Sequence, residues 1–534
     1  MTIEQLDRVE EAAPTESSAR ADRMIEFLRE YGARRINSAV MDDRRTVTPG
    51  AILDYGNAGL FGLQVEQEFG GQQLSYRDAW RVIEQVAAID LNLGLVVGVH
   101  NAVGVTPIHR FADPQVKSAV LPLLATGRSL ATIASSEPGA GSHVRAIATT
   151  ARRTADGYVV DGTKAWTSLG SWAGHITLLA RLVDENGRRR GITAFLVEGR
   201  SEGFTPRHEV ATMGMRGLPQ NTIDINGLRL RPADLLGPEG AGMKVGECAF
   251  HAGRGLLSAG SVGVMKRCLQ LAGRYVLRRS VATGRLIENG RVQQILSDCQ
   301  AATRAVEILV GHLAAELDAG REVPGEVYST CKVVSSELSF QVADWCVQLM
   351  GARGYLDTNQ VSQFFRDIRL LRIFEGSTEL LTMHLGSRLG RAPGVLADLL
   401  VTGFDGQTTL ETVERAHREV FGGIPRQSSG REAQRNGQIL ASLGGEIACW
   451  ALLSAAVARM ARRTGTELDQ YTDQWARHQL TDRIRRASDR QRQFGILGAD
   501  SLTDGLHAYQ RSIGDVTPSL PGLDWESDVL LRRS

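Results

Sequence analysis

Residues 157–170 read GYVVDGTKAWTSLG, and this stretch decides the fold because its periodicity is extended rather than helical. Residues 157–162 are typical of a strand that runs into a turn, since aromatic and β-branched residues stand between two glycines. Residues 192–198 and 222–230 are further predicted strands, punctuated by Gly, Pro and Asn. We therefore expect a β-rich region from residue 129 to about 236.

Helical periodicity is predicted on both sides of this region, with apolar residues three and four positions apart over 16–130 and 242–389. An Ala-Pro-Gly sequence at 392–394 marks a further boundary. The tail beyond it is again mostly helical, and we expect its Pro/Gly-rich end to be irregular. Strands grouped between helices, without alternating βα units, argue against a doubly wound dinucleotide-binding fold.

The chain length suggests three or four domains, because 534 residues are too many for one hydrophobic core. The predicted fold class is a multidomain α+β protein. Its predicted domains are an N-terminal α-helical domain (1–128), a middle β-domain (129–240), a C-terminal helical bundle (241–393) and an additional helical extension (394–534).

The charge balance argues against a nucleic-acid-binding protein, since 61 Lys and Arg residues nearly cancel 60 Asp and Glu residues. No signal peptide and no run of eighteen apolar residues is found, so no integral membrane segment is predicted. The six cysteines are widely spaced without a CxxC pair, which indicates free thiols in a reducing cytoplasm. The eleven histidines are scattered without an HExxH or Cys/His cluster, so no metal site is expected.

The segment IASSEPGAGS at residues 133–142 is the first that indicates chemistry. Its glycines let the main chain approach a flat or anionic ligand, to which N–H groups and hydroxyls can donate hydrogen bonds. Residues 164–170, KAWTSLG, then put an indole beside two hydroxyls at the end of a strand, where a heterocycle could stack. Taken alone, the first segment also fits a plain β-turn, and the tryptophan also fits a core position.

Two segments near residue 360 complete the set. Residues 348–355, QLMGARGY, form a small-residue loop that by itself fits a helix C-cap. Residues 365–379, FRDIRLLRIFEGSTE, place Glu375 between a phenylalanine and a glycine. In an apolar pocket such a carboxylate has a raised pKa and is a credible general base. The alternative is an exposed glutamate in the first turn of a helix, where it complements the helix dipole.

Together these segments resemble the acyl-CoA dehydrogenase family. SSEPGAGS resembles its TEPxAGSD signature, KAWTSLG its KxWITNG, and RDIRLLRIFEGSTEL its RDxxxxxIYEGTxEI. Residues 213–216 (MGMR) and 236–242 (LGPEGAG) also stand where the family has MGxR and LLGxEGxG. The resemblance covers residues 20 to 392.

The resemblance implies a helical domain, a middle β-domain of barrel or sheet type and a C-terminal four-helix bundle, with FAD between them and across a subunit interface. Residues expected to line the flavin ring are Ile133, Ser135, Ser136, Ser142, Trp166 and Ser168. Residues expected to reach the pyrophosphate and adenosine half of a neighbouring subunit's FAD are Arg279, Gln348, Gly351 and Ala352. Ser377 and Glu379 are expected to contact the cofactor just past the base.

The resemblance also implies that Glu375 removes the α-proton of an acyl thioester while the β-hydride passes to the flavin. Ser142 and Arg254 match positions that contact the thioester ligand, and His251 stands where an acidic residue meets the CoA portion. Some members carry their base at the position of Gly253, which has no carboxylate here. Glu375 is therefore the expected base.

Several positions depart from the family pattern. His143 replaces an aspartate, Leu169 an asparagine and Gly290 a glutamine, while the RxxFGxPI motif is degraded at residues 279–287. These changes, with His251, motivate an alternative: a specialised relative acting on a carrier-protein-bound or free acyl substrate of secondary metabolism, in which oxidation is coupled to oxygen chemistry. The electron acceptor would be a flavoprotein in the leading hypothesis and O2 in the alternative. A scaffold without catalysis is a third hypothesis, against which the intact Glu375 argues.

The tail of about 140 residues resembles the extension of very-long-chain members in architecture. Such members tend to be dimers because the extension occupies the surface that a second dimer would cover. A homodimer is therefore expected, with a tetramer as the alternative. Residues 477–492 are rich in arginine and would fit either a membrane surface or a solvated helix face.

Overall fold

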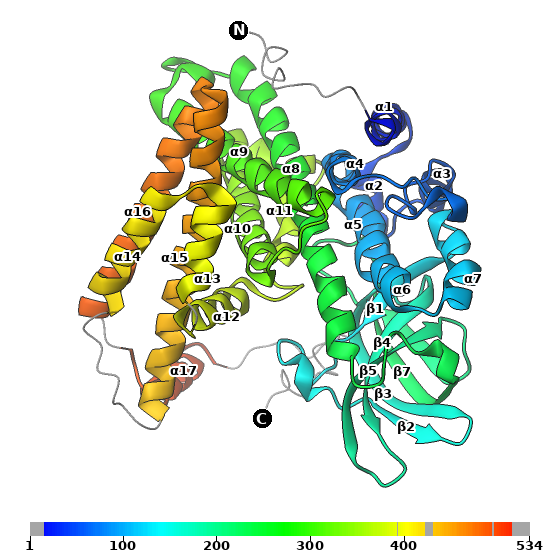
Figure 1. Ribbon diagram of the computed structural model, residues 1–534. Coiled ribbons are helices and arrows are strands. Elements are labelled where there is room, and N and C mark those ends of the chain that lie inside the picture. Colours follow the sequence, from blue (N-terminus) through cyan, green and yellow to red (C-terminus); the bar gives the residue numbers. More distant parts are fainter. Residues whose placement is uncertain (1–14, 392, 422–430, 494–495, 515–534) are drawn as a thin grey trace.

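The computed structural model describes residues 15–391, 393–421, 431–493 and 496–514. Along the chain its helices precede and follow a sheet region, as the periodicity predicts, and Figure 1 shows the sheet at the lower right of the view. The N-terminal helices are α1 (Glu16–Arg35), α2 (Ser38–Arg44), α3 (Pro49–Asn57), α4 (Tyr76–Ile89), α5 (Leu91–Val99), η3 (His100–Val105), α6 (Thr106–Phe111) and α7 (Pro114–Ala125). The fold class is confirmed, and these helices lie within residues 16–130, where helical periodicity is predicted.

The middle region is a seven-stranded mixed sheet in which the pairing runs β1-β4-β2-β3-β7-β6. β1 and β2 pair with successive parts of one edge of β4, and β5 pairs with its opposite edge. Its strands are β1 (Leu130–Ala134), β2 (Thr150–Thr154), β3 (Gly157–Ser168), β4 (Ala173–Val183), β5 (Arg189–Glu198), β6 (Phe204–Glu209) and β7 (Gln220–Leu230). The pairing of β3 with β7 is interrupted between Lys164 and Thr167. Trp166 takes φ 58° at this irregularity and is 60% exposed. The interruption therefore turns a large aromatic side chain out of the sheet.

Long helices form the bundle that follows. They are α8 (Gly242–Arg278), α9 (Gly290–Asp318), α10 (Gly325–Met350), η7 (Gly351–Tyr355), α11 (Gln360–Ile368), η8 (Arg369–Arg372) and α12 (Thr378–Arg391), with the small hairpin β8 (Ser280–Val281) and β9 (Gly284–Arg285) after α8. Glycines let α8 approach α4 closely: a Cβ on Gly263 would overlap the carbonyl oxygen of Glu84, and one on Gly255 would meet the ring of Trp80. This close approach joins the bundle to the N-terminal helices.

The C-terminal extension packs on the bundle. Its helices are α13 (Pro393–Asp398), α14 (Gln407–Phe421), α15 (Arg431–Thr464), α16 (Glu467–Gln493) and α17 (Ala499–Ile513). At the crossing of α12 and α15, a Cβ on Gly386 would overlap the carbonyl of Ala441, and a Cβ on Gly445 would overlap that of Thr382. The sequence did not lead us to expect α17, and the predicted irregular end beyond residue 514 lies outside the described residues.

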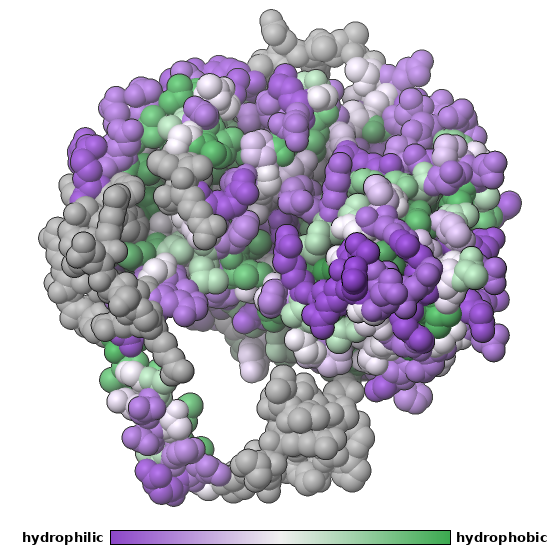
Figure 2. All heavy atoms as spheres, turned by 60° about the horizontal axis from the view of Figure 1, so that its bottom comes forward, coloured by the Kyte–Doolittle hydropathy of each residue, from purple (hydrophilic) through white to green (hydrophobic). Residues whose placement is uncertain are grey.

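Two stretches of the described chain are apolar and long enough to cross a membrane, Leu91–Phe111 and Gln434–Thr464. In their most apolar windows, 83% and 61% of the residues are buried inside the protein, as in core helices. Hydrophilic residues cover most of the face drawn in Figure 2, with hydrophobic residues scattered among them. All six cysteines are free, as predicted, and each is buried except Cys248, which is half-buried.

Candidate functional site

Glu375 lies in the short turn between η8 and α12. The turn has left-handed backbone at two consecutive residues, with φ 56° at Glu375 and 92° at Gly376. A left-handed conformation is uncommon outside glycine and persists only where the surroundings hold it. One carboxylate oxygen of Glu375, Oε2, is buried and has no hydrogen-bond partner. The turn thus presents an unpaired carboxylate oxygen to the interior.

This carboxylate faces an apolar pocket between α4, α5 and α8. Leu91, Leu95, Val99, Leu256 and Phe374 contribute to its wall. Four glycines also line the pocket, Gly94, Gly98, Gly253 and Gly260, and a Cβ added at Gly98 would meet nothing within 4 Å. Glycine at position 98 therefore leaves space in the pocket, which has the apolar lining and single polar group of a small-molecule site.

Gly253 accommodates the carboxylate directly. A Cβ at this position would lie 3.2 Å from Oε2 of Glu375 and 3.1 Å from Cγ1 of Val103. Both distances are tighter than ordinary van der Waals contact. Some family members carry a base at position 253. Here a side chain at that position would contact the carboxylate of Glu375.

Burial raises the pKa of Glu375 to about 7, against the opposing effect of two nearby cations, Arg254 and Lys332. Arg254 on α8 donates from Nε to the carbonyl oxygen of Glu375 at 3.2 Å. Lys332 on α10 donates from Nζ to the carbonyl oxygen of Gly376 at 2.5 Å. Near neutral pH the carboxylate is therefore balanced between its protonated and ionised forms.

The motif reasoning missed Lys332. Its signal in the sequence is one cation within a helix of otherwise small and apolar residues, Tyr328–Ser336. A lysine with no exposed surface is rare unless it has a partner. Such a residue is identified as part of a site only once the helix has been placed beside its partner.

A buried ion pair holds the segment 133–142. Lys164, with no exposed side-chain surface, donates to Oε1 of Glu137 at 2.8 Å and to the carbonyl of Ser135 at 3.1 Å. Glu137 also accepts from the backbone N–H groups of Ala148 and Thr149, at 2.5 and 3.0 Å. Burial opposes ionisation, but Lys164 and these donors hold the pKa of Glu137 below its usual range. Lys164 of β3 therefore holds the segment 133–142 against that strand.

The residues expected around the flavin ring lie at the ends of β1 and β3. Ser168 accepts a hydrogen bond from Gln220 at 2.8 Å, and its carbonyl accepts from Thr132. The indole of Trp166 and the hydroxyl residue Ser142 are exposed, whereas Ile133, Ser135 and Ser136 are half-buried. An exposed indole beside hydroxyls at one edge of a sheet fits a flat heterocycle that stacks and accepts hydrogen bonds.

The residues expected at the adenosine half lie elsewhere. Arg279, Gln348, Gly351 and Ala352 are exposed at the C-terminal ends of α8 and α10. The two ends lie side by side, since the guanidinium of Arg353 is 5.8 Å from the ring centre of Tyr275. The N-terminal end of α8 approaches β5, and its 37 residues span about 55 Å. Within one chain, the residues expected at the adenosine half therefore lie far from those expected around the flavin ring.

The remaining predicted residues lie near Glu375. Ser377 accepts from the N–H of Leu380 at 3.3 Å and so caps α12, while Glu379 is exposed. His251 lies one helical turn before Arg254 and stacks on Tyr328, with ring centres 4.6 Å apart and an interplanar angle of 2°. Burial, with the charge of Arg254, lowers the pKa of His251. A flat, largely neutral pair thus stands where the family pattern has an acid.

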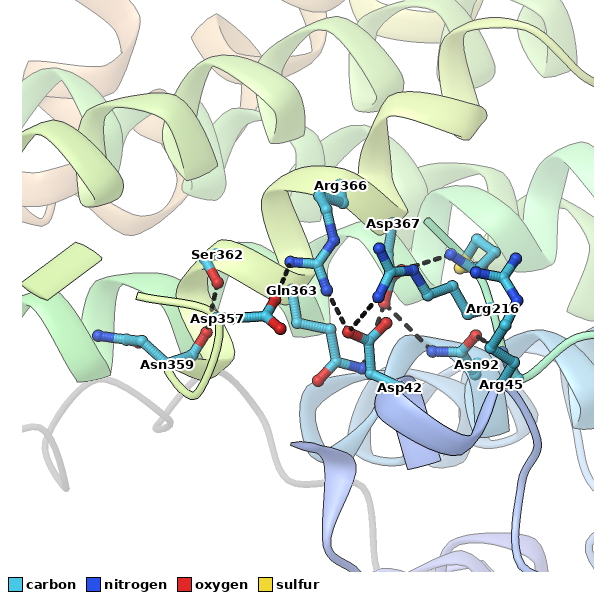
Figure 3. A network of polar contacts seen from close by, with 12 residues as sticks. Asp42, Arg45, Asn92, Arg216, Asp357, Asn359, Ser362, Gln363, Arg366 and Asp367 are labelled. Carbon is cyan, nitrogen blue, oxygen red and sulfur yellow. Dashed lines mark hydrogen bonds and ion pairs between the residues drawn. The ribbon is translucent and has the colours of Figure 1, made fainter. Parts of the chain in front are cut away.

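A polar network links the MGMR segment to the RD pair of the Glu375 motif (Figure 3). Asp367 on α11 accepts from the N–H of Met215 at 2.5 Å and from Nδ2 of Asn92 at 3.1 Å. Burial and the neighbouring Asp90 raise the pKa of Asp367 to about 7.

The same network includes Asp42 of α2, which pairs with Arg216 at 3.3 Å and with Arg366. Three regions far apart in sequence thereby meet eight residues before the base. The MGMR and RD motifs are thus joined by residues, Asp42 and Asn92, that no motif indicated.

The fold and this site define a class of protein in which helical domains flank a mixed sheet, and an apolar pocket between helices holds a carboxylate with one unpaired oxygen. Models of the acyl-CoA dehydrogenase N-terminal, middle and C-terminal domains match residues 15–128, 132–228 and 240–390. The chain therefore belongs to the acyl-CoA dehydrogenase family, whose members are FAD-dependent oxidoreductases acting on CH–CH groups. The recognition made from the motifs is confirmed.

Among its relatives is "Probable acyl-CoA dehydrogenase FadE10" of Mycobacterium tuberculosis, 30% identical over 379 residues. The alignment covers 68% of this chain but only 58% of that relative. An acyl-CoA dehydrogenase from Bacillus anthracis solved with FAD has a TM-score of 0.75 at 22% identity, covering 97% of this chain and 95% of the other. The prolyl acyl carrier protein oxidase AnaB has a TM-score of 0.67 at 22% identity, covering 71% of this chain and all of the other.

Proposed function

We propose that the protein catalyses FAD-dependent α,β-dehydrogenation of an acyl thioester, with Glu375 as the base. The observation that carries this proposal is the buried Oε2 of Glu375, which has no partner and faces the apolar pocket. An unpaired buried acceptor is costly unless a ligand or a proton transfer uses it. Membership of the acyl-CoA dehydrogenase family supports the reaction class.

In the proposed reaction the α C–H bond breaks and its proton moves to Oε2 of Glu375. A base with a pKa of about 7 is ionised often enough at neutral pH and still binds the proton firmly. The backbone N–H of Glu375 would donate to the thioester carbonyl and stabilise the enolate charge. FAD, when bound, supplies the acceptor for the β-hydride.

For the cofactor, the exposed Trp166 indole and the hydroxyls of Ser135, Ser136 and Ser142 would hold the flavin ring. Arg279 and Gln348 would hold the pyrophosphate and adenosine half, together with the glycine-rich turn that follows α10. Because the two groups lie at opposite ends of α8, we propose that they serve different FAD molecules in a homodimer. A tetramer is the alternative.

We propose that the pocket takes the acyl chain and that Ser142, Arg254 and His251 face the thioester and its carrier. The four domains predicted from the sequence are kept in this proposal, and the three matched domain models support the first three. The free cysteines support a cytoplasmic location.

A second candidate is a carrier-protein-bound or free acyl substrate with O2 as the acceptor in place of a flavoprotein. The observation that favours it is the stack of His251 on Tyr328, where the family pattern has an acidic residue. A neutral aromatic pair offers a flat apolar contact rather than an acceptor for the amide groups of CoA.

The test mixes the yellow holoenzyme anaerobically with acyl-CoAs from short to long and from straight to branched, and follows the visible flavin band. We expect rapid bleaching with one group, and at least a thousand-fold slower bleaching in Glu375→Gln with FAD retained. Normal bleaching in that variant would remove the base assignment. No bleaching with any acyl-CoA, while dithionite reduces the flavin, would favour the second candidate.

A further inference from the structure

Lys332 is a charged side chain with no exposed surface, in the middle of α10. Its ammonium donates to the carbonyl of Gly376 at 2.5 Å. It is distinct from the residues of the family motifs and belongs to another helix. A buried cation is costly, so its partner indicates what the position requires.

The partner of Lys332 is one of two consecutive carbonyls that are held by cations from two helices. Arg254 of α8 donates to the carbonyl of Glu375, and Lys332 of α10 donates to the next carbonyl, that of Gly376. Both residues of the turn have positive φ. Two fixed donors on adjacent carbonyls orient the two peptide planes on either side of Gly376, and with them the direction of the Glu375 side chain.

We propose that Lys332 is a positioning residue that, together with Arg254, clamps the Glu375–Gly376 turn so that the carboxylate points into the apolar pocket. The inference rests on the proposed role of Glu375 as the base. Without the clamp, the left-handed glutamate would relax toward a commoner conformation and carry Oε2 away from its approach to Gly253.

Lys332 also acts on the charge of the base. The cations that face Glu375 are Arg254 from α8 and Lys332 from α10, and both favour its ionised form. Lys332 itself is faced by Arg254 and by the carboxylates Glu375, Glu337 and Glu379. Burial lowers the pKa of Lys332 to about 8, so it remains mostly charged at neutral pH. Removing the ammonium should therefore make Glu375 harder to ionise.

The test follows the carboxyl stretching band of Glu375 by infrared difference spectroscopy as the holoenzyme is titrated, with Glu375→Gln identifying the band. In Lys332→Met the midpoint should move to higher pH by about one unit, because one of two nearby cations is gone. Ser339→Ala is the matched control, since Ser339 is buried on the same helix and donates only to that helix at Ser336. An unchanged midpoint in Lys332→Met would overturn the proposal.

The second measurement separates the hydrogen bond from the charge. Lys332→Gln keeps a donor but no charge, so it should show the same midpoint shift as Lys332→Met. Anaerobic flavin reduction at pH 7, where Lys332 is mostly charged, is divided by the ionised fraction of Glu375 taken from each infrared midpoint. The rate corrected in this way should be about a hundred-fold slower in Lys332→Met than in wild type, and less impaired in Lys332→Gln. Equal corrected rates in Lys332→Met and wild type would contradict the clamp.

These measurements also distinguish the clamp from the proposed function. If no acyl thioester reduces the wild-type flavin, the dehydrogenation proposal fails, yet the infrared midpoints still decide whether Lys332 acts on Glu375. If Lys332→Met does not bind FAD, Lys332→Gln provides the midpoint.

Discussion

Gly253 and Glu375 approach so closely that a Cβ at position 253 would fit only if its neighbours moved by a few tenths of an ångström. A Cβ on Gly253 would lie 3.2 Å from Oε2 of Glu375. The two residues come from different helical segments, α8 and the turn before α12, and are 122 positions apart in the chain. The glycine therefore determines where the carboxylate can stand.

Gly253→Ala should displace the carboxylate by a few tenths of an ångström and slow flavin reduction roughly ten-fold, because proton transfer depends steeply on alignment. Stopped-flow reduction at saturating substrate measures the effect. Gly273→Ala, on the same helix with nothing within 4 Å of the added Cβ, is the control and should leave the rate unchanged. A wild-type rate in Gly253→Ala would mean that the base tolerates the displacement.

The pH dependence of flavin reduction should report the ionisation of Glu375. Its folded pKa is raised to about 7, and only the ionised form accepts a proton, so the rate should fall about ten-fold per pH unit below that value. Reduction by substrate over pH 5–9 measures the limb. In Glu375→Gln the residual rate of reduction should not fall as the pH decreases. A fall that persists in this variant would assign the ionisation to another group.

The same raised pKa should lower stability at alkaline pH. Ionisation costs nothing below the unfolded pKa near 4.5, since both states are protonated there, and the full cost is present above about 7. Glu375→Gln should therefore raise the Tm by roughly 2–4 °C at pH 8 and by much less at pH 4.5. Calorimetry of the FAD-bound forms at both values measures the difference. An equal gain at both pH values would point to packing rather than charge.

Gly98→Leu should shorten the acyl pocket. A Cβ at Gly98 meets nothing within 4 Å and the residue lines the pocket, so a larger side chain would occupy space meant for substrate. We expect long acyl-CoAs to lose activity about a hundred-fold while short ones keep theirs, as kcat/KM across a chain-length series would measure. Gly311→Leu is the control, because that glycine is exposed on α9 with open space around it. A uniform loss of kcat/KM across all chain lengths would contradict the idea that Gly98 sets the depth of the acyl pocket.

Lys164→Met should destabilise the loop that bears the flavin-side residues. It leaves Glu137 buried without its cation, which costs about 3–5 kcal/mol. We expect a lower Tm and weaker FAD binding, measured by thermal unfolding and by titration of the apoprotein. The double variant Lys164→Met with Glu137→Gln should recover part of the loss, because no charge is then left unpaired. No recovery would indicate that the hydrogen bonds of Glu137 matter more than its charge.

Much of the fold was predictable because local patterns determine local structure. The extended periodicity of residues 157–162 and the apolar spacing of α4 depend only on neighbours in the chain. The pairing of β4 with both β1 and β2 along one edge, and with β5 along the other, was not predictable, since register depends on contacts between distant strands. The helix α17 was missed although Leu502, Leu506, Tyr509 and Ile513 follow helical spacing, and all four are exposed in the structure.

For the site, the sequence by itself indicated the candidate chemistry: an FEGS turn with a candidate base at Glu375, a glycine-rich loop at residues 133–142, and Trp166 near the end of a strand. Motif residues are readable because they lie together in the chain. Only the tertiary structure decided the environment of the base, in which Gly253 admits the carboxylate, Lys332 and Arg254 hold its turn, and apolar helices raise its pKa to about 7. Desolvation and hydrogen bonding depend on distances between elements far apart in sequence, and packing alone sets those distances.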